Sequence, residues 1–170
     1  MIKKRLLHHV IISVFSKPHD DKEKILVGLN VLSPVSIKEL LEQEAAHDSD
    51  HEQTLHYRVK DVDLTVQKVE TDDGKMIVYT LFFKKMHDTS IFAKKIVACM
   101  TPEEKKEYHA FPERLLDFEE RLSLRLDKEL LMNGTLSFTD SGDCYKIKAS
   151  VAAYPKTRER ILLLLQNIVS

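Results

Sequence analysis

Strict alternation of apolar and polar residues predicts β-strands in the second half of the chain. Leu122, Leu124 and Leu126 share one face of an alternating run, which is the pattern of a half-buried strand. Residues 144–153 repeat the pattern, with apolar side chains on one face and lysines and a serine on the other. Both runs carry Arg or Lys on the polar side, so the pattern predicts a sheet with a basic face.

The first half of the chain contains further β-rich segments. Residues 7–16 are rich in Val and Ile and predict a strand near the middle of a sheet. Residues 55–69 and 75–85 predict two more strands, and Thr71-Asp72-Asp73-Gly74 between them is a strong hairpin signal.

Helical periodicity separates these strands. Asp20 and Glu23 predict a capping box for a helix that ends at Ser33-Pro34, and Asp88 predicts the start of a second helix. A third helix should begin at Thr101 and a last one at Pro155, whereas residues 35–52 fit either a strand or a helix. The order of elements predicts a single α+β domain over residues 1–170, a two-layer sandwich of helices on a mainly antiparallel sheet. An acidic loop at residues 46–53 should be mobile.

Composition excludes several classes of protein. The 170 residues are 43% apolar and 31% charged, as in an ordinary globular domain, and the net charge of -1 gives no general attraction for polyanions. Any affinity for nucleic acid must therefore come from local clusters of charge. Cys99 and Cys144 fit neither a zinc site nor a disulfide framework, so we expect no cofactor. No apolar run reaches the roughly 20 residues of a membrane span, and we expect a cytoplasmic protein.

Two parts of the chain resemble one family. The opening HHVIISVFSKPHDDKEKI, the run RLSLRLDKELLMNGTLSF and the following DCYKIKASVAAYPKTRERI resemble small archaeal RNA-binding proteins associated with the exosome. The resemblance implies a fold like that of the large-subunit ribosomal protein that binds 5S RNA, a fold also likened to double-stranded-RNA-binding domains. It implies a role in RNA processing or ribosome biogenesis and does not imply catalysis.

Basic residues around the predicted sheet are the candidate RNA contacts. Lysine and arginine at scattered positions suffice to bind phosphates and 2′-hydroxyl groups. Aromatic residues are few, so contact with the RNA backbone is better supported than stacking of single-stranded bases. Charges near the start of the last helix oppose its dipole, which favours a phosphate partner there. The candidates are Lys17, Arg125, Lys128, Lys146, Lys148, Lys156 and Arg158.

Each candidate has a simpler interpretation. The sheet lysines and arginine could form an ordinary solvated strand face or lie beneath helices, and Lys17 could be a solvated lysine at a strand end. A further run of positive charge is interpreted as an ordinary solvent-exposed face, and it contains Lys84, Lys85, Lys94 and Lys95.

Three functions follow from these patterns. The first is a non-catalytic RNA-binding protein, an accessory factor whose partners are structured RNA and exosome or ribosomal proteins. The second is a protein-interaction adaptor that docks a basic partner on the acidic segment 39–52. The third is a metal-dependent enzyme using His47, Asp48, Asp50, His51 and His56; because Asp and Ser there favour a loop, it is the least supported.

Overall fold

The structure, a computed structural model, describes residues 5–43, 46–48 and 51–170, with side chains for 5–43 and 53–170. The strands are β1 Leu7–Ser16, β2 Ala46–Asp48, β3 His51–Val59, β4 Val62–Thr71, β5 Gly74–Phe83, β6 Leu122–Asp127 and β7 Cys144–Val151. The helices are α1 Lys22–Leu32, α2 Ile37–Leu41, α3 Met86–Cys99, α4 Pro102–Ala110, the 3-10 turn η1 Pro112–Leu115, α5 Lys128–Met132 and α6 Arg158–Val169.

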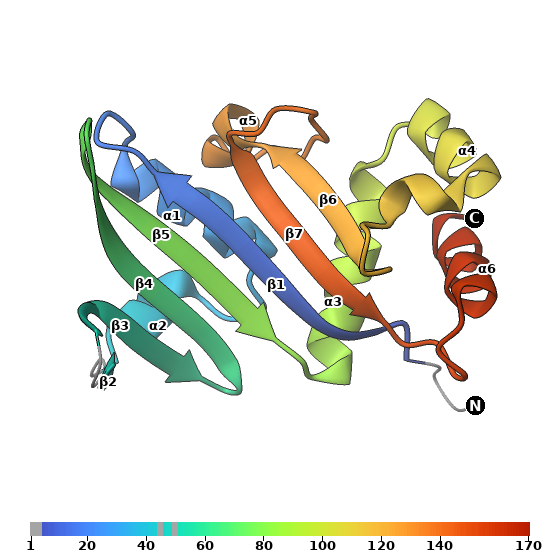
Figure 1. Ribbon diagram of the computed structural model, residues 1–170, viewed down its shortest axis with the longest axis horizontal. Coiled ribbons are helices and arrows are strands. Elements are labelled where there is room, and N and C mark those ends of the chain that lie inside the picture. Colours follow the sequence, from blue (N-terminus) through green and yellow to red (C-terminus); the bar gives the residue numbers. More distant parts are fainter. Residues whose placement is uncertain (1–4, 44–45, 49–50) are drawn as a thin grey trace.

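The strands described here form one seven-stranded antiparallel sheet in the order β2-β3-β4-β5-β1-β7-β6. Helices α1, α2 and α3 lie behind this sheet, and its near face carries no helix over the central strands (Figure 1). The prediction of an α+β two-layer sandwich is confirmed. We call the face away from the helices the open face.

Strand β1 occupies the interior position that its Val- and Ile-rich sequence predicts. It pairs with β5 on one side and β7 on the other, so that Ile12 lies between Leu81 and Ile147. These three side chains point to the helices and are fully buried. Ile11, Ser13 and Phe15 alternate with the buried Val10, Ile12 and Val14 and lie on the open face, because neighbouring residues of a strand point to opposite sides.

The helix starts follow the predicted chemistry in part. Asp88 does not start α3, because this helix begins at Met86 after an N-cap at Lys85, and Asp88 lies within its first turn. The capping box at α4 is present, with the side chains of Thr101 and Glu104 each accepting a backbone N–H of the other. The cap of α1, however, is Asp21 rather than Asp20, because the Asp21 carboxylate accepts the N–H of Glu23. The Asp20 carboxylate is thereby left for other partners.

Two predictions about residues 46–69 were wrong. The run 55–69 is not one strand, because Lys60 and Asp61 have positive φ angles of 50° and 63° and turn β3 back into β4. A turn with positive φ angles usually contains glycine or asparagine. Lys60-Asp61 contains neither residue, so the sequence did not reveal this turn. The backbone of 46–48 and of 51–53 belongs to β2 and β3 rather than to a loop. The predicted mobility of residues 49–50 lies outside the described residues.

A tyrosine joins the sheet to helix α1. The Tyr145 ring lies fully buried on β7, and its hydroxyl donates to the carbonyl oxygen of Ile25 in α1 at 2.7 Å. The contact requires Gly28 on the helix, since a Cβ at that position would overlap the hydroxyl and ring of Tyr145. Burial raises the pKa of Tyr145 well above its ordinary value, so the hydroxyl remains a donor.

We expect Gly28→Ala to lower the free energy of unfolding by about 1–2 kcal/mol, because steric overlap with Tyr145 outweighs the better helix propensity of alanine. Urea denaturation measures the change. Gly142→Ala is the control, since a Cβ there meets no atom within 4 Å. The same Gly28 change made in a Tyr145→Phe background should cost less, and an equal cost in both backgrounds would contradict this assignment.

Candidate nucleic-acid interface

The strand register brings two positive charges together on the open face. Arg125 of β6 lies directly opposite Lys146 of β7. Like charges at opposed positions of a sheet repel. The Arg125 guanidinium donates to the carbonyl oxygen of Asp140 at 3.1 Å, whereas Lys146 is exposed and pairs with no carboxylate among the described side chains. Neither cation forms an ion pair with a carboxylate among the described side chains, although Glu104, Glu107 and Asp140 line the same pocket as Arg125.

Lys148, two residues further along β7, is held on the same face by a carboxylate. Its ammonium lies 2.6 Å from the Asp117 carboxylate. The other oxygen of Asp117 accepts the backbone N–H groups of Glu119 and Arg121, each at 2.9 Å. Burial opposes the charged form of Asp117, but the bonds from Lys148 and from these two amides outweigh burial and lower its pKa to about 2. Asp117 therefore positions Lys148 while partly offsetting its charge.

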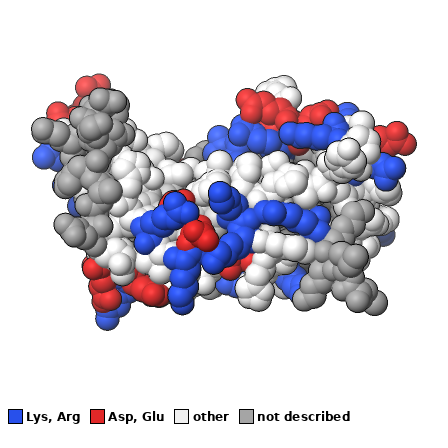
Figure 2. Space-filling view, turned by 90° about the horizontal axis from the view of Figure 1, so that it is seen from below, with Lys and Arg blue, Asp and Glu red and all other residues white. Residues whose placement is uncertain are grey.

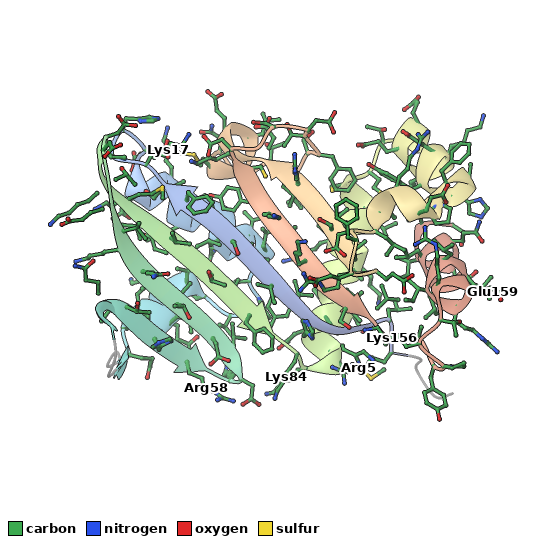
Figure 3. All side chains as sticks on the ribbon, viewed as in Figure 1. Arg5, Lys17, Arg58, Lys84, Lys156 and Glu159 are labelled. Atoms are coloured by element: carbon green, nitrogen blue, oxygen red, sulfur yellow. The ribbon has the colours of Figure 1, made fainter. Side chains whose placement is uncertain are left out.

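A second group of positive side chains lies where the strands end at the bottom of the sheet in Figure 3, and we call this row of strand ends the lower edge. Arg58, Lys84, Arg5 and Lys156 follow one another along this edge (Figure 3), and Figure 2 shows Lys and Arg gathered at the middle of the corresponding surface. Asp61 neutralises part of this positive charge, because its carboxylate pairs with Arg58 at 2.9 Å and with Lys85 at 3.5 Å.

The Arg5 guanidinium forms no ion pair with a carboxylate among the described side chains, although it is well bonded. It donates to the carbonyl oxygens of Leu7 at 2.9 Å, of His8 at 2.6 Å and of Lys84. Carbonyl oxygens accept hydrogen bonds without supplying a negative charge. Arg5 is therefore fixed in place as a net positive group, between the start of β1 and the end of β5.

His9 connects the lower edge with the open face. Its pKa is lowered by burial and by the positive charges around it, which come from His8, Arg121, Lys156 and Arg5. Burial is the largest cause of this pKa shift, and the four charged groups add to it from around the ring. His9 also packs against Phe82 of β5, with ring centroids 5.7 Å apart.

Lys17 and Lys128 lie elsewhere. Lys17 is at the upper edge, at the opposite end of the sheet from Lys156 (Figure 3). Lys128 is only 6% exposed, and its ammonium is 2.7 Å from Asp20 and 2.9 Å from Asp143. Lys17 adds to the same cluster through Asp143 at 3.3 Å. Since Lys128 is enclosed by carboxylates, we leave it out of the interface.

Asp20 is the acceptor that organises this cluster. Burial raises its pKa, but bonds from the Lys128 ammonium and from the Lys17 backbone N–H outweigh burial, so that the net shift is downward. The cluster joins the turn after β1 to the start of α5, which are 108 residues apart in sequence.

The last two candidates flank the start of α6. This helix begins at Arg158 rather than at Pro155, and the Thr157 hydroxyl caps it by accepting the N–H of Arg160. Lys156 therefore lies one residue before the cap and Arg158 is the first residue of the helix, so both charges lie at the positive end of its dipole. Arg158 lies 3.6 Å from Glu120. Of the seven sequence candidates, the structure brings Arg125, Lys146 and Lys148 together, with Lys156 at the adjoining lower edge.

The sequence patterns missed Arg5, His9 and Lys84. Arg5 lies in a basic run that resembles a signal peptide, and Lys84 lies in a charge run of ordinary appearance. Only the sheet register places them beside Lys156. The alternation of residues along β1 does place His9 on the same face as Ser13. This pattern could have predicted that His9 lies on the open face.

Reactive groups are few in the part of the chain that has described side chains. Burial raises the pKa values of the Cys99 and Cys144 thiols, so both are poor nucleophiles. Residues 5–43 and 53–170 contain no group of three His, Cys, Asp or Glu side chains able to hold a metal ion. The side chains of His47 and His51 lie outside this part. No helix of the described chain is long and apolar enough to cross a membrane.

An open antiparallel sheet with a basic face defines a surface suited to a polyanion. Residues 9–151 match the model of a family described as RNA binding, and the chain belongs to that family. Among curated proteins no match was found.

Solved archaeal structures share the fold. A DUF54 family protein from Archaeglobus fulgidus is 20% identical over 95% of this chain and 99% of its own, with a TM-score of 0.68. A DUF54 protein from Methanothermobacter thermautotrophicus is 17% identical over 97% of this chain and 99% of its own, with a TM-score of 0.67. A third, from Sulfolobus solfataricus, is 20% identical over 94% and 98%, with a TM-score of 0.58.

We expect Lys128→Met to lower the free energy of unfolding by about 2–3 kcal/mol, because it leaves the Asp20 and Asp143 carboxylates without their shared cation. Urea denaturation measures this loss, with Lys22→Met on the exposed side of α1 as the control. RNA affinity of the folded variant should equal that of the wild type. A tenfold loss of affinity by the folded variant would return Lys128 to the interface.

Asp117 should make stability depend on pH in the acid range. Because its pKa is lowered to about 2 in the folded protein from 3.8, its contribution is present above about pH 4 and is lost as the pH falls toward 2. Between pH 5 and pH 2, we expect the wild type to lose about 1 kcal/mol more than Asp117→Asn, after allowance for solvent screening. Thermal unfolding across this range is the measurement, with Asp72→Asn in the β4–β5 turn as the control. Parallel pH profiles for wild type and Asp117→Asn would contradict the assignment.

Proposed function

We propose that this protein is a non-catalytic RNA-binding factor that contacts the RNA backbone through the open face of its sheet. Arg125 and Lys146 carry the proposal. Two opposed cations on a solvent-facing sheet disfavour folding, and their repulsion is relieved when a phosphate lies between or above them. Membership of an RNA-binding family supports the choice of polyanion.

The lower edge extends the proposed contact. Lys148 lies two residues from Lys146 on β7, and Arg5 and Lys156 lie near His9. Arg121 is paired with Glu119 at 2.6 Å and with Asp117 at 3.5 Å, so its charge is offset. A phosphate backbone could therefore follow β7 from the open face to the lower edge. Proteins that follow a backbone in this way bind by charge and shape rather than by sequence.

The proposed setting is the cytoplasm, where the protein acts as an accessory factor in RNA processing beside the exosome or in ribosome biogenesis. The resemblance of the RLSLRLDKELLMNG and HHVIISVFSKPHDD segments to exosome-associated archaeal proteins supports this setting. Copurification from cell extract, followed by sequencing of bound RNA and identification of bound proteins, tests it. Recovery of neither ribosomal nor exosome components would count against it.

Replacing Arg125 and Lys146 together with glutamine should weaken RNA binding about tenfold and should not lower the free energy of unfolding, because the change removes a like-charge pair. The slope of log affinity against log salt should become shallower by about one to two. Fluorescence anisotropy with a labelled RNA measures both quantities.

The control for this experiment is Lys22→Gln with Lys24→Gln. These lysines are exposed on α1, in the layer behind the sheet, and their replacement changes the net charge by the same amount. If both double variants weaken binding equally, the open face is not the RNA surface.

A further inference from the structure

The open face carries apolar residues that a merely solvated sheet would not need. In the β1–β5 register, Ile11 lies opposite Phe82 and Phe15 lies opposite Val78. All four are on the side away from the helices. Phe15 is 44% exposed, and the other three are partly exposed. An antiparallel sheet with one face in water normally presents polar residues there, so this stripe requires an explanation.

The apolar stripe runs beside the basic residues. Ile11 lies between Phe82 on β5 and Lys148 on β7, and Ser13 lies between Thr80 and Lys146. Neighbouring strands are about 4.8 Å apart. Ile11 is thus one strand spacing from the Lys148 position on β7, and Phe82 is two.

A third aromatic residue adjoins the same surface. Phe118 is fully exposed. It follows Asp117, whose carboxylate binds Lys148 of the open face and also accepts the backbone N–H groups of Glu119 and Arg121. These bonds order the backbone of the loop that carries Phe118, and its side chain lines a surface pocket with Glu113, Leu116, Asp117, Glu120 and Arg158.

We propose that the open face binds single-stranded RNA, with unpaired bases stacked on Phe15, Phe82 and Phe118 and phosphates held by Arg125, Lys146 and Lys148. This inference rests on the proposed RNA-binding function and specifies the class of RNA. It differs from the expectation drawn from sequence, because only the register shows that Phe15 and Phe82 share the solvent side with the lysines.

Two physical arguments favour an unpaired strand over a duplex. Bases of a duplex are stacked within the helix, so exposed aromatic rings gain nothing from them, whereas splayed bases of a single strand stack on such rings. Phe15 and Ile11, the partner of Phe82, are four residues apart, or about 13 Å along the strand. That spacing exceeds the roughly 3.4 Å rise of stacked bases several times, which suits bases spread apart.

The charge distribution also favours RNA over a second copy of this chain. A two-fold interface places the same patch on both partners. Such an interface, centred on this patch, would set Arg125, Lys146 and Lys148 of one copy close to those of the other, with Asp117 offsetting part of the charge of Lys148. A polyanion relieves this repulsion while covering the apolar stripe.

The test compares two labelled RNAs with the full-length protein by fluorescence anisotropy: a 12-nucleotide oligouridine strand and a 12-base-pair duplex. We expect the single strand to bind more tightly. Phe118→Ala and Phe15→Ala should each weaken single-strand binding about tenfold and leave duplex binding unchanged. Phe111→Ala is the matched control, because Phe111 is 48% exposed but lies at the end of α4, where Arg114 covers its ring at 4.7 Å.

The outcomes separate this inference from the proposed function. Phe118 is fully exposed, so its replacement should not disturb folding even if Phe15→Ala does. Duplex binding at equal or higher affinity, or single-strand binding unaffected by Phe118→Ala, would overturn the single-strand inference and leave RNA binding intact. Failure to bind either RNA would overturn both. Dimerisation that Phe15→Ala abolishes, without any binding of the oligouridine, would assign the stripe to a second copy of the chain.

Discussion

The position of β1 between β5 and β7 is the constraint on which the rest of the structure depends. Within the described sheet, β2 to β5 form one continuous antiparallel meander and β6 pairs with β7, and β1 joins these two parts. Both pairings of β1 connect residues far apart in sequence. Placing the Val- and Ile-rich strand in the interior buries its apolar face and brings lysines from the C-terminal part of the chain next to aromatic residues from the N-terminal part.

The two ends of β1 have different roles. At the upper end, Asp20 and Asp143 enclose the Lys128 ammonium, and Lys17 joins the same cluster. These residues come from the two segments that carry the family resemblance, so part of that resemblance reflects a structural cluster rather than an RNA contact. At the lower end, Arg5 is bound by carbonyl oxygens and keeps its positive charge available. Whether a basic group is neutralised therefore depends on its acceptor, which sequence alone does not show.

The sequence predicted what depends on local pattern. Alternation placed Leu124 and Ile147 in the core and Arg125, Lys146 and Lys148 on the other face, and the Thr101–Glu104 capping box is present as expected. The turn at Lys60-Asp61 was missed because its positive φ angles are adopted without glycine or asparagine. The burial of Lys128 and the proximity of Arg5, His9 and Lys156 depend on long-range packing, for which no local signal exists.

The contact between Tyr145 and Gly28 links the two layers of the molecule. Tyr145 reaches into α1 from β7, and the next residue, Lys146, points to the opposite side of the same strand. A backbone shift at Tyr145 would therefore also displace the adjoining Lys146, with no change of residue on the open face. Sequence variation in this family that is confined to the interior could in this way tune affinity for a ligand that never touches the altered residues.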